Sequence, residues 1–376
     1  MLATSILSII IIAIISSLQP DNIYIKLSHS NVLQSNARFK YLVIIILFLT
    51  LGILITDSYD IGFYKIAYEQ RIPHAKEPLF DFIQFFFHDI GFSFALFKSF
   101  WLLLISLLLY KGVKAFGQKP EQAIALSFFI VLLSFITQMR SSLAFAVLLN
   151  CIPLLYSNKP LSKVLYAFFV VLCAQMHAVA YMFLLFMIVK KDGHRQYRKI
   201  FFVVLGCLSL LIIGFNTSFV KIVSVLLSHA PVSLSLSSRI VASISGIGTP
   251  IKASLFLICK QLFLYLLTNK ACTIQAKNDS ENRGKYEVIN EINTLSLIFI
   301  PICLVNASFL RLFNPIALIQ YAMILNIGYE KFSISKRTTF KVTMKTVLLC
   351  FSLFVLLVSV HSNPEDYIRV IGSIGL

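Results

Sequence analysis

Long apolar runs fill most of the chain, and short polar or basic segments separate them. A helix needs roughly 20 apolar residues to cross a bilayer, and runs near that length occur at about 3–18, 40–56, 91–110, 121–137, 141–157, 164–189, 200–215, 250–268, 288–307, 312–328 and 343–361. Their apolar residues are continuous and do not alternate, which is typical of helices and not of barrel strands. The pattern predicts an all-α polytopic membrane protein, a single integral membrane domain over residues 1–376 with about 11 to 12 transmembrane helices.

Composition supports this class of protein. Of the 376 residues 58% are hydrophobic and 13% are charged, which is too apolar for a soluble domain of this size. The first run, Leu2 to Leu18, has no preceding basic residue and no clear small-residue cleavage site, so we expect a helix that stays attached. The seven cysteines lack CxxC spacing and lie mostly in apolar runs. No zinc-type His/Glu spacing, phosphate-binding loop or dinucleotide fingerprint occurs, so we predict no metal and no cofactor.

The basic residues predict the topology. The formal net charge of +17 would suggest nucleic acid in a soluble protein, but here basic clusters alternate with the apolar runs, so no nucleic-acid partner is expected. The positive-inside rule places in the cytoplasm the clusters near 26–40, 111–119, 159–163, 190–199, 270–285 and 331–345. The N-terminus then lies outside. The outer segments become 57–90, 138–140, 306–311 and 216–250, of which the last contains a Ser-rich stretch that reads as a flexible loop or a short interfacial helix.

One apolar run is predicted to be broken. Lys163 and Lys190 are both assigned to the cytoplasm, yet a single stretch of about 26 apolar residues joins them, so the chain must cross an even number of times. The polar break from Cys173 to His177 lies in its middle. We therefore predict two short half-spans in 164–189, with His177 near the outward tip, as is tolerated where such helices are buried in protein or line a cavity.

Segment 57–90 is rich in acids and aromatic rings. It carries Asp57, Asp60, Glu69, Glu77, Asp81 and Asp89 together with Tyr59, Phe63, Tyr64, Tyr68 and Phe80. Carboxylates accept hydrogen bonds from hydroxyls and rings stack on C–H faces, a combination that suits sugars; the alternative is a solvated outer loop. Within this segment, residues 82–88 predict an interfacial helix.

Two arginines lie on the predicted outer side of the membrane, where the positive-inside rule makes positive charge least expected. Arg140 and Arg311 lie at outer turns, at the starts of helices that run inward, and Arg239 is a weaker third candidate in the Ser-rich segment. A helix N-terminus offers free N–H groups beside a bidentate guanidinium, which predicts a phosphate or diphosphate site. The alternative is an interfacial arginine whose side chain reaches water. His177 is either a general base, a neutral hydrogen-bond donor or a satisfied core residue.

The order of these motifs resembles a known family. Asp57-Ser58-Tyr59-Asp60, then Tyr64, Glu77-Pro78-Leu79-Phe80, Gln138-Met139-Arg140, a histidine in a broken span and Arg311 are similar in order to the EpsG-type and Wzy-type polysaccharide (O-antigen) polymerases of bacteria. The resemblance covers about residues 50–328.

The resemblance implies a multi-pass glycosyltransferase of the bacterial inner membrane. Such an enzyme moves a growing glycan from undecaprenyl diphosphate onto a hydroxyl of the next lipid-linked repeat at the outer face of the membrane. Its implied partners are the lipid bilayer and a chain-length-regulating co-polymerase. The leaving diphosphate needs fixed cations and the acceptor needs a base. The expected residues are His177, Asp57, Asp60 and Glu77 as catalytic groups, Arg140, Arg311 and Arg239 for the diphosphate, and Tyr59, Tyr64, Gln138 and Gln175 for substrate.

Two other classes of function stay open. Charged residues in a cavity and broken helices also serve a flippase for lipid-linked oligosaccharide. An outer-face glycan ligase or acyltransferase would act on the same glycans. Because the predicted charges gather at one face and do not line a path across the membrane, the sequence favours an enzyme.

Overall fold

The computed structural model describes scattered residues between 42 and 58, and residues 59–74, 77–127, 133–157, 159–189, 195–214, 251–305, 307–327 and 334–362. These residues form helices, and no strand occurs among them. Four of the described helical segments are long and apolar enough to span a membrane, namely Phe94–Lys114, Met139–Tyr156, Leu255–Asn278 and Arg283–Val305, and five shorter apolar helices accompany them. The all-α polytopic membrane class is thus confirmed, while the total of 11 to 12 spans stays a prediction.

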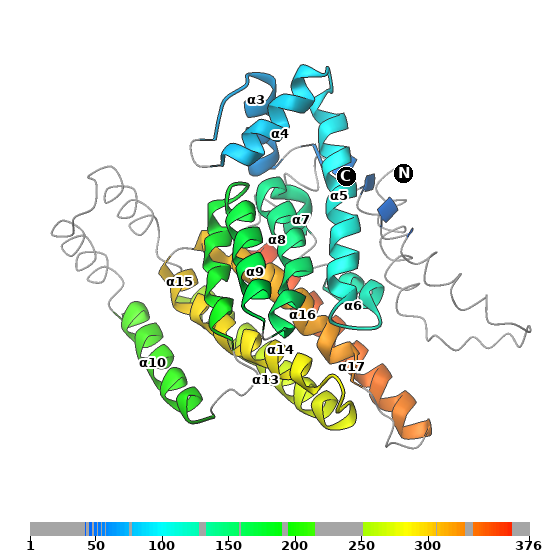
Figure 1. The fold of residues 1–376 in the computed structure, drawn as a ribbon, viewed down its shortest axis with the longest axis vertical. Coiled ribbons are helices and arrows are strands. Elements are labelled where there is room, and N and C mark those ends of the chain that lie inside the picture. Colours follow the sequence, from blue (N-terminus) through cyan, green and yellow to red (C-terminus); the bar gives the residue numbers. More distant parts are fainter. Residues whose placement is uncertain are drawn as a thin grey trace, which may run out of the picture. The chain divides into compact units, whose positions relative to one another are not determined.

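The chain divides into two compact units. The first comprises residues 1–187 and 317–376, and the second comprises residues 188–316. In the first unit lie α3 (Tyr59–Glu69), α4 (Pro78–Asp89), α5 (Phe94–Lys114), α6 (Pro120–Leu126), α7 (Leu133–Thr137), α8 (Met139–Cys151), η2 (Ile152–Tyr156), α9 (Pro160–Ala174), η3 (Ala178–Ile188) and α17 (Ile334–Ser362) (Figure 1). The single membrane domain expected from the sequence stays a prediction.

The second unit contains α10 (Arg195–Gly214), α13 (Ile251–Asn278), α14 (Arg283–Leu295), η4 (Ser296–Ile298), α15 (Phe299–Val305) and η5 (Ala307–Leu312), and α16 (Phe313–Leu325) begins there. The amide of Asn293 on α14 donates to the backbone oxygen of Tyr265 on α13, over 3.1 Å. The turn between these helices is closed by the Tyr286 hydroxyl, which donates to Asp279 over 3.0 Å. The outer loop expected at 216–250 lies outside the described residues.

Helices α5 and α8 pack against each other in the first unit. The indole N–H of Trp101 donates to the Met139 oxygen over 2.9 Å, and the Asn150 amide donates to the Leu108 oxygen over 2.8 Å, so both ends of the contact are hydrogen bonded. Near the Asn150 end, Gly112 permits the close approach of the two helices, because a Cβ there would lie 2.8 Å from the Cβ of Leu149. These contacts fix the N-terminus of α8 against α5.

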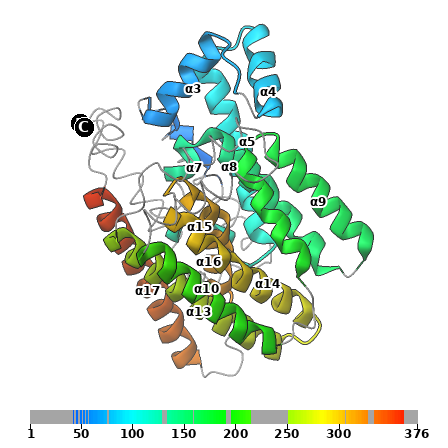
Figure 2. The same ribbon diagram turned by 90° about the vertical axis from the view of Figure 1, so that its left-hand side faces the viewer.

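Segment 57–90, expected to be an outer loop, contains two helices. The Ser58 hydroxyl accepts from Ile61 N and begins α3, while Pro78 occupies the first turn of α4, where its missing N–H costs nothing. Helix α4 includes the range 82–88 for which the sequence predicts a helix. Both helices lie at one end of α5 (Figures 1 and 2), and Tyr68 of α3 stacks on Phe97 of α5 with ring centroids 5.0 Å apart.

The predicted break in span 164–189 is confirmed. Helix α9 ends at Ala174, and the 3₁₀ helix η3 begins at Ala178. The arms run antiparallel, because the Lys163 amine donates to the Met187 oxygen over 3.0 Å and the Tyr166 hydroxyl to the Phe183 oxygen over 2.9 Å. With 15 residues in α9 and 11 in η3, each arm is about 22 Å long, shorter than the ~30 Å hydrocarbon core. Gln175, Met176 and His177 therefore form the tip of a hairpin; which side of the membrane it faces stays a prediction.

Candidate active site

Arg140 stands at the second residue of helix α8, as the sequence predicts for a helix start. The helical conformation is interrupted at Gln138, between α7 and α8. The hydroxyls of Ser141 and Ser142 donate to the Gln138 backbone oxygen over 3.2 and 2.7 Å. Trp101 holds the neighbouring Met139 oxygen from α5. The guanidinium thus projects from a backbone that is fixed on both sides.

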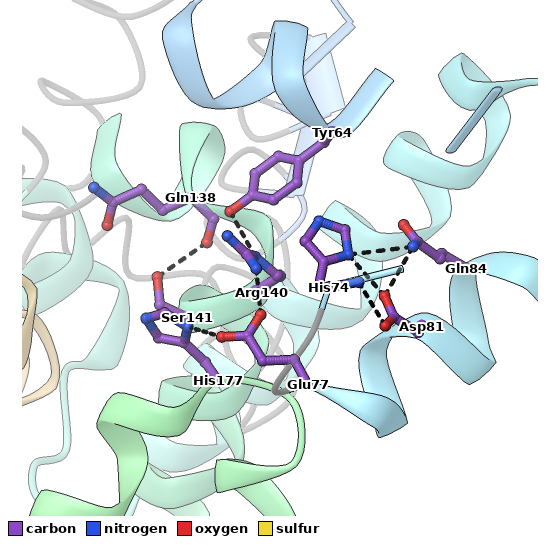
Figure 3. A network of polar contacts seen from close by, with 9 residues as sticks. All are labelled: Tyr64, His74, Glu77, Asp81, Gln84, Gln138, Arg140, Ser141 and His177. Carbon is purple, nitrogen blue, oxygen red and sulfur yellow. Dashed lines mark hydrogen bonds and ion pairs between the residues drawn. The ribbon is translucent and has the colours of Figure 1, made fainter. Parts of the chain in front are cut away.

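Glu77 joins Arg140 to the hairpin tip. Its Oε2 forms an ion pair with Nη1 of Arg140, and its Oε1 lies 2.6 Å from Nδ1 of His177 (Figure 3). The side chains of Glu77, His177 and Arg140 are 8%, 10% and 20% exposed. A carboxylate so deeply buried is tolerated only because each oxygen has a hydrogen-bonding partner. The three residues come from three separate segments of the chain.

The carboxylate of Glu77 is held ionised. Burial by itself raises the pKa of Glu77, but the hydrogen bond and charge of His177, together with those of Arg140, outweigh it, so the pKa lies below its ordinary value of 4.5. An ionised carboxylate only accepts hydrogen bonds, so Nδ1 of His177 is the donor in this pair. In the neutral ring, a proton on Nδ1 leaves Nε2 as the acceptor nitrogen.

Tyr64 of α3 covers the guanidinium. The Nε of Arg140 donates to the Tyr64 hydroxyl over 3.2 Å, and the guanidinium carbon lies 5.1 Å from the centre of the tyrosine ring. Tyr64 is itself 3% exposed. Glu77 and Tyr64 therefore occupy two edges of the guanidinium, and no described residue accepts a hydrogen bond from Nη2. That third edge can still bind an anion while the side chain stays fixed.

A backbone contact places the Glu77 turn on the hairpin tip. The Leu79 N–H donates to the Gln175 oxygen over 3.1 Å, two residues from Glu77 and two from His177. The Gln175 side chain turns to the Tyr181 hydroxyl, 3.1 Å away, and the Gln138 side chain accepts from Ser134 over 2.9 Å. Both glutamines lie beside the cluster, and their expected contacts to substrate stay predictions.

Five other residues are expected in the site. Asp57 and Arg239 lie outside the described residues, as does the side chain of Tyr59, whose backbone begins α3. Asp60 is half-buried in the first turn of α3, and no described residue bonds to its carboxylate. Arg311 is half-buried in the second unit, two residues before α16 begins at Phe313. The roles assigned to these residues stay predictions.

A second polar cluster, not expected from the sequence, adjoins the first. His74 donates to Asp81 twice, from its backbone N to Oδ2 and from its ring Nδ1 to Oδ1, both over 2.7 Å. The Gln84 amide also donates to Asp81, over 3.0 Å. The sequence marks Asp81 only as one of six acids, because nothing in the spacing of His74 and Asp81 indicates that they pair.

These elements define a multi-pass membrane protein with a buried cluster of cation, carboxylate and imidazole. The family model of the EpsG family matches residues 39–370, so the chain belongs to the EpsG family. This membership supports a polysaccharide-polymerase type of function. The same comparisons find no match among curated proteins or solved structures.

Proposed function

We propose that this protein polymerises oligosaccharide repeats carried on undecaprenyl diphosphate, at the outer face of the bacterial inner membrane. The observation that carries the proposal is the buried Glu77 carboxylate, held between the Arg140 guanidinium and the His177 imidazole. A glycosyl transfer from a lipid diphosphate needs a fixed cation for the leaving group and a base for the acceptor. EpsG family membership supports the same class of function.

Arg140 stabilises the leaving group in this reaction. The bond from the anomeric carbon to the diphosphate oxygen breaks, and its electron pair stays on the diphosphate. Nη2 of Arg140 and the N-terminal N–H groups of α8 are the donors for that charge, because Glu77 and Tyr64 already fix the other edges of the guanidinium. Arg311 and Arg239 remain candidates for further phosphate contacts.

His177 takes the proton of the acceptor hydroxyl. The acceptor oxygen forms the new bond to the anomeric carbon, and its proton moves to Nε2 of the ring. Glu77 keeps the other nitrogen protonated and stabilises the imidazolium that results. Asp57 and Asp60 are the alternative bases.

The lipid part of the substrate and the bilayer face apolar surface beside the site. Helix α4, whose N-cap is Glu77, carries the exposed apolar residues Phe82 and Phe86, and Ile90 follows it. An exposed apolar helix face of this kind suits acyl or polyprenyl chains at the membrane interface. We further propose a chain-length-regulating co-polymerase as partner.

The test is a gel of surface glycan from a strain that lacks the gene and is complemented with variants. Arg140→Ala and His177→Ala should each lower polymer formation by about 10²-fold or more. The matched controls are Arg71→Ala, at an arginine 51% exposed, and His88→Ala, at a histidine 34% exposed, and both should give a normal ladder.

The surface glycan that remains when no polymer forms distinguishes the classes of function. Loss of a polymerase leaves single repeats on the surface, whereas loss of a flippase leaves none. Normal ladders from well-expressed Arg140→Ala and His177→Ala proteins would refute the catalytic cluster. For the orientation, a cysteine at residue 177 should react with an impermeant reagent added from outside, and reaction only from the cytoplasm would contradict the outward tip.

A further inference from the structure

We propose that His74 and Asp81 are positioning residues, which hold Glu77 between Arg140 and His177. They act through two hydrogen bonds from His74 to Asp81, donated by the ring Nδ1 and the backbone nitrogen of His74, and through the backbone hydrogen bonds that join both residues to Glu77. The inference rests on the proposed function, because it assigns these residues a role in that reaction. They are not expected to touch the substrate. Their hydrogen bonds form a closed loop around Glu77.

Hydrogen bonds connect the two clusters along the backbone. The Glu77 N–H donates to the His74 oxygen over 3.0 Å, and the Asp81 N–H donates to the Glu77 oxygen over 3.1 Å. Asp81 in turn accepts from the His74 backbone N over 2.7 Å. The peptide groups of Glu77 are thus fixed from both sides by residues that also bond to each other, so the direction of its side chain depends on the His74–Asp81 pair.

The Asp81 carboxylate is the centre of this loop. Its oxygens accept from three donors, namely the backbone and Nδ1 of His74 and the amide of Gln84 (Figure 3). Both side chains are buried, at 5% exposed for His74 and 11% for Asp81. Three donors and no acceptor around one carboxylate mean that an uncharged amide cannot replace it without opposing at least one donor.

The ring of His74 is fixed by its neighbours as well as by Asp81. Its centroid lies 5.6 Å from that of Phe63, 6.2 Å from Tyr64 and 5.3 Å from Phe80. Tyr64 is the residue that covers Arg140. The His74 ring therefore supports the cluster at two points, through the backbone of Glu77 and against the ring of Tyr64.

A role for His74 through Nδ1 and a role through Nε2 predict opposite effects of substitution. Nδ1 donates to Asp81, whereas Nε2 is buried and has no hydrogen-bond partner among the described residues. A positioning role acts through Nδ1, and a direct role in proton transfer or sugar binding would act through Nε2. In asparagine the side-chain amide nitrogen stands near the place of Nδ1, and in glutamine it stands near the place of Nε2.

The test compares His74→Asn with His74→Gln in purified full-length protein, with lipid-linked repeats as substrate. We expect His74→Asn to keep the rate within about 3-fold of wild type and His74→Gln to lower kcat by roughly 10- to 100-fold, as misplaced catalytic groups do, with little change in KM. Both variants remove the imidazole ring, so loss of ring packing affects them alike. The opposite order of activities, equal activities, or loss in both would overturn the positioning role.

A stability measurement separates this proposal from the proposed function. The shifts in melting temperature of His74→Gln and Glu77→Gln should be non-additive in the double variant, because one loop of hydrogen bonds connects the residues. Additive shifts would overturn the coupling whatever the enzyme does. If coupling holds but Arg140→Ala leaves polymerisation intact, the proposed function fails and the positioning of Glu77 stands.

Discussion

Replacing Glu77 by glutamine keeps the shape of the side chain and removes its charge. Both partners of Glu77 are donors, Nη1 of Arg140 and Nδ1 of His177. A glutamine accepts through one oxygen and presents an N–H₂ group through the other position, so it satisfies one donor and opposes the second. The variant therefore leaves a buried cation or a buried imidazole N–H without its acceptor.

The size of the effect follows from burial. Breaking a buried ion pair by removing one partner costs about 3–5 kcal/mol. Arg140 is 20% exposed and keeps some contact with water, which puts the expected loss of unfolding free energy at the lower end, about 3 kcal/mol. At 1.4 kcal/mol for each factor of ten, this corresponds to roughly a 10²-fold change in the folding equilibrium.

The assay is thermal or denaturant unfolding of the purified protein in detergent. Glu69→Gln is the matched control, since Glu69 is 54% exposed and lies 4.0 Å from Lys65, a pair expected to contribute less than about 1 kcal/mol. A double-mutant cycle of Glu77→Gln with Arg140→Ala should show a coupling free energy of at least about 1 kcal/mol. If Glu77→Gln is no less stable than Glu69→Gln, or if the cycle shows no coupling, the buried pair does not stabilise the fold as argued.

Three further changes test other contacts. Because the pKa of Glu77 lies below 4.5, the contribution of its carboxylate to the unfolding free energy should be complete above about pH 5 and lost as pH falls through the lowered pKa. In Arg140→Ala this loss should begin at higher pH. An acid unfolding transition at the same pH in both proteins would contradict this. Tyr166→Phe removes the hydrogen bond to Phe183 and should lower the unfolding free energy by about 1 kcal/mol, measured by the same unfolding assay. Gly112→Ala should destabilise the α5–α8 contact by about 1–3 kcal/mol, whereas Gly62→Ala, with no atom within 4 Å of the new Cβ, should be neutral or stabilising in unfolding measurements; equal effects would refute the close approach.

Much of the candidate site could be found from the sequence. Arg140 and His177 stand out because a charged or titratable group in an apolar run is costly and marks a turn, a partner or a function. The break at Gln175 to His177 follows from charge counting between Lys163 and Lys190, and the helix start at Arg140 follows from the polar triplet around it. Glu77 and Tyr64 lie in a segment with six acids and several rings. The family resemblance narrows the acids to Asp57, Asp60 and Glu77, but nothing in the sequence ranks one of these three above the others.

The pairing of Glu77 with both Arg140 and His177 needed the tertiary structure. These residues are 63 and 100 positions apart in the chain, and no periodicity connects positions so distant. The role of His74 and Asp81 was missed for a related reason. Their contact depends on a turn and on the start of α4, and a single sequence does not specify the angle at which two such segments meet.

The sequence alone determined the membrane class, the helical character and the places where helices break, because each of these depends on the local cost of polar groups in an apolar run. Tertiary structure decided which carboxylate neutralises which cation. That choice depends on burial, since the charges of Glu77 and Arg140 become costly only once other segments exclude water around them. Hydropathy along the chain is a local property, and burial of a charge is a property of the packed protein.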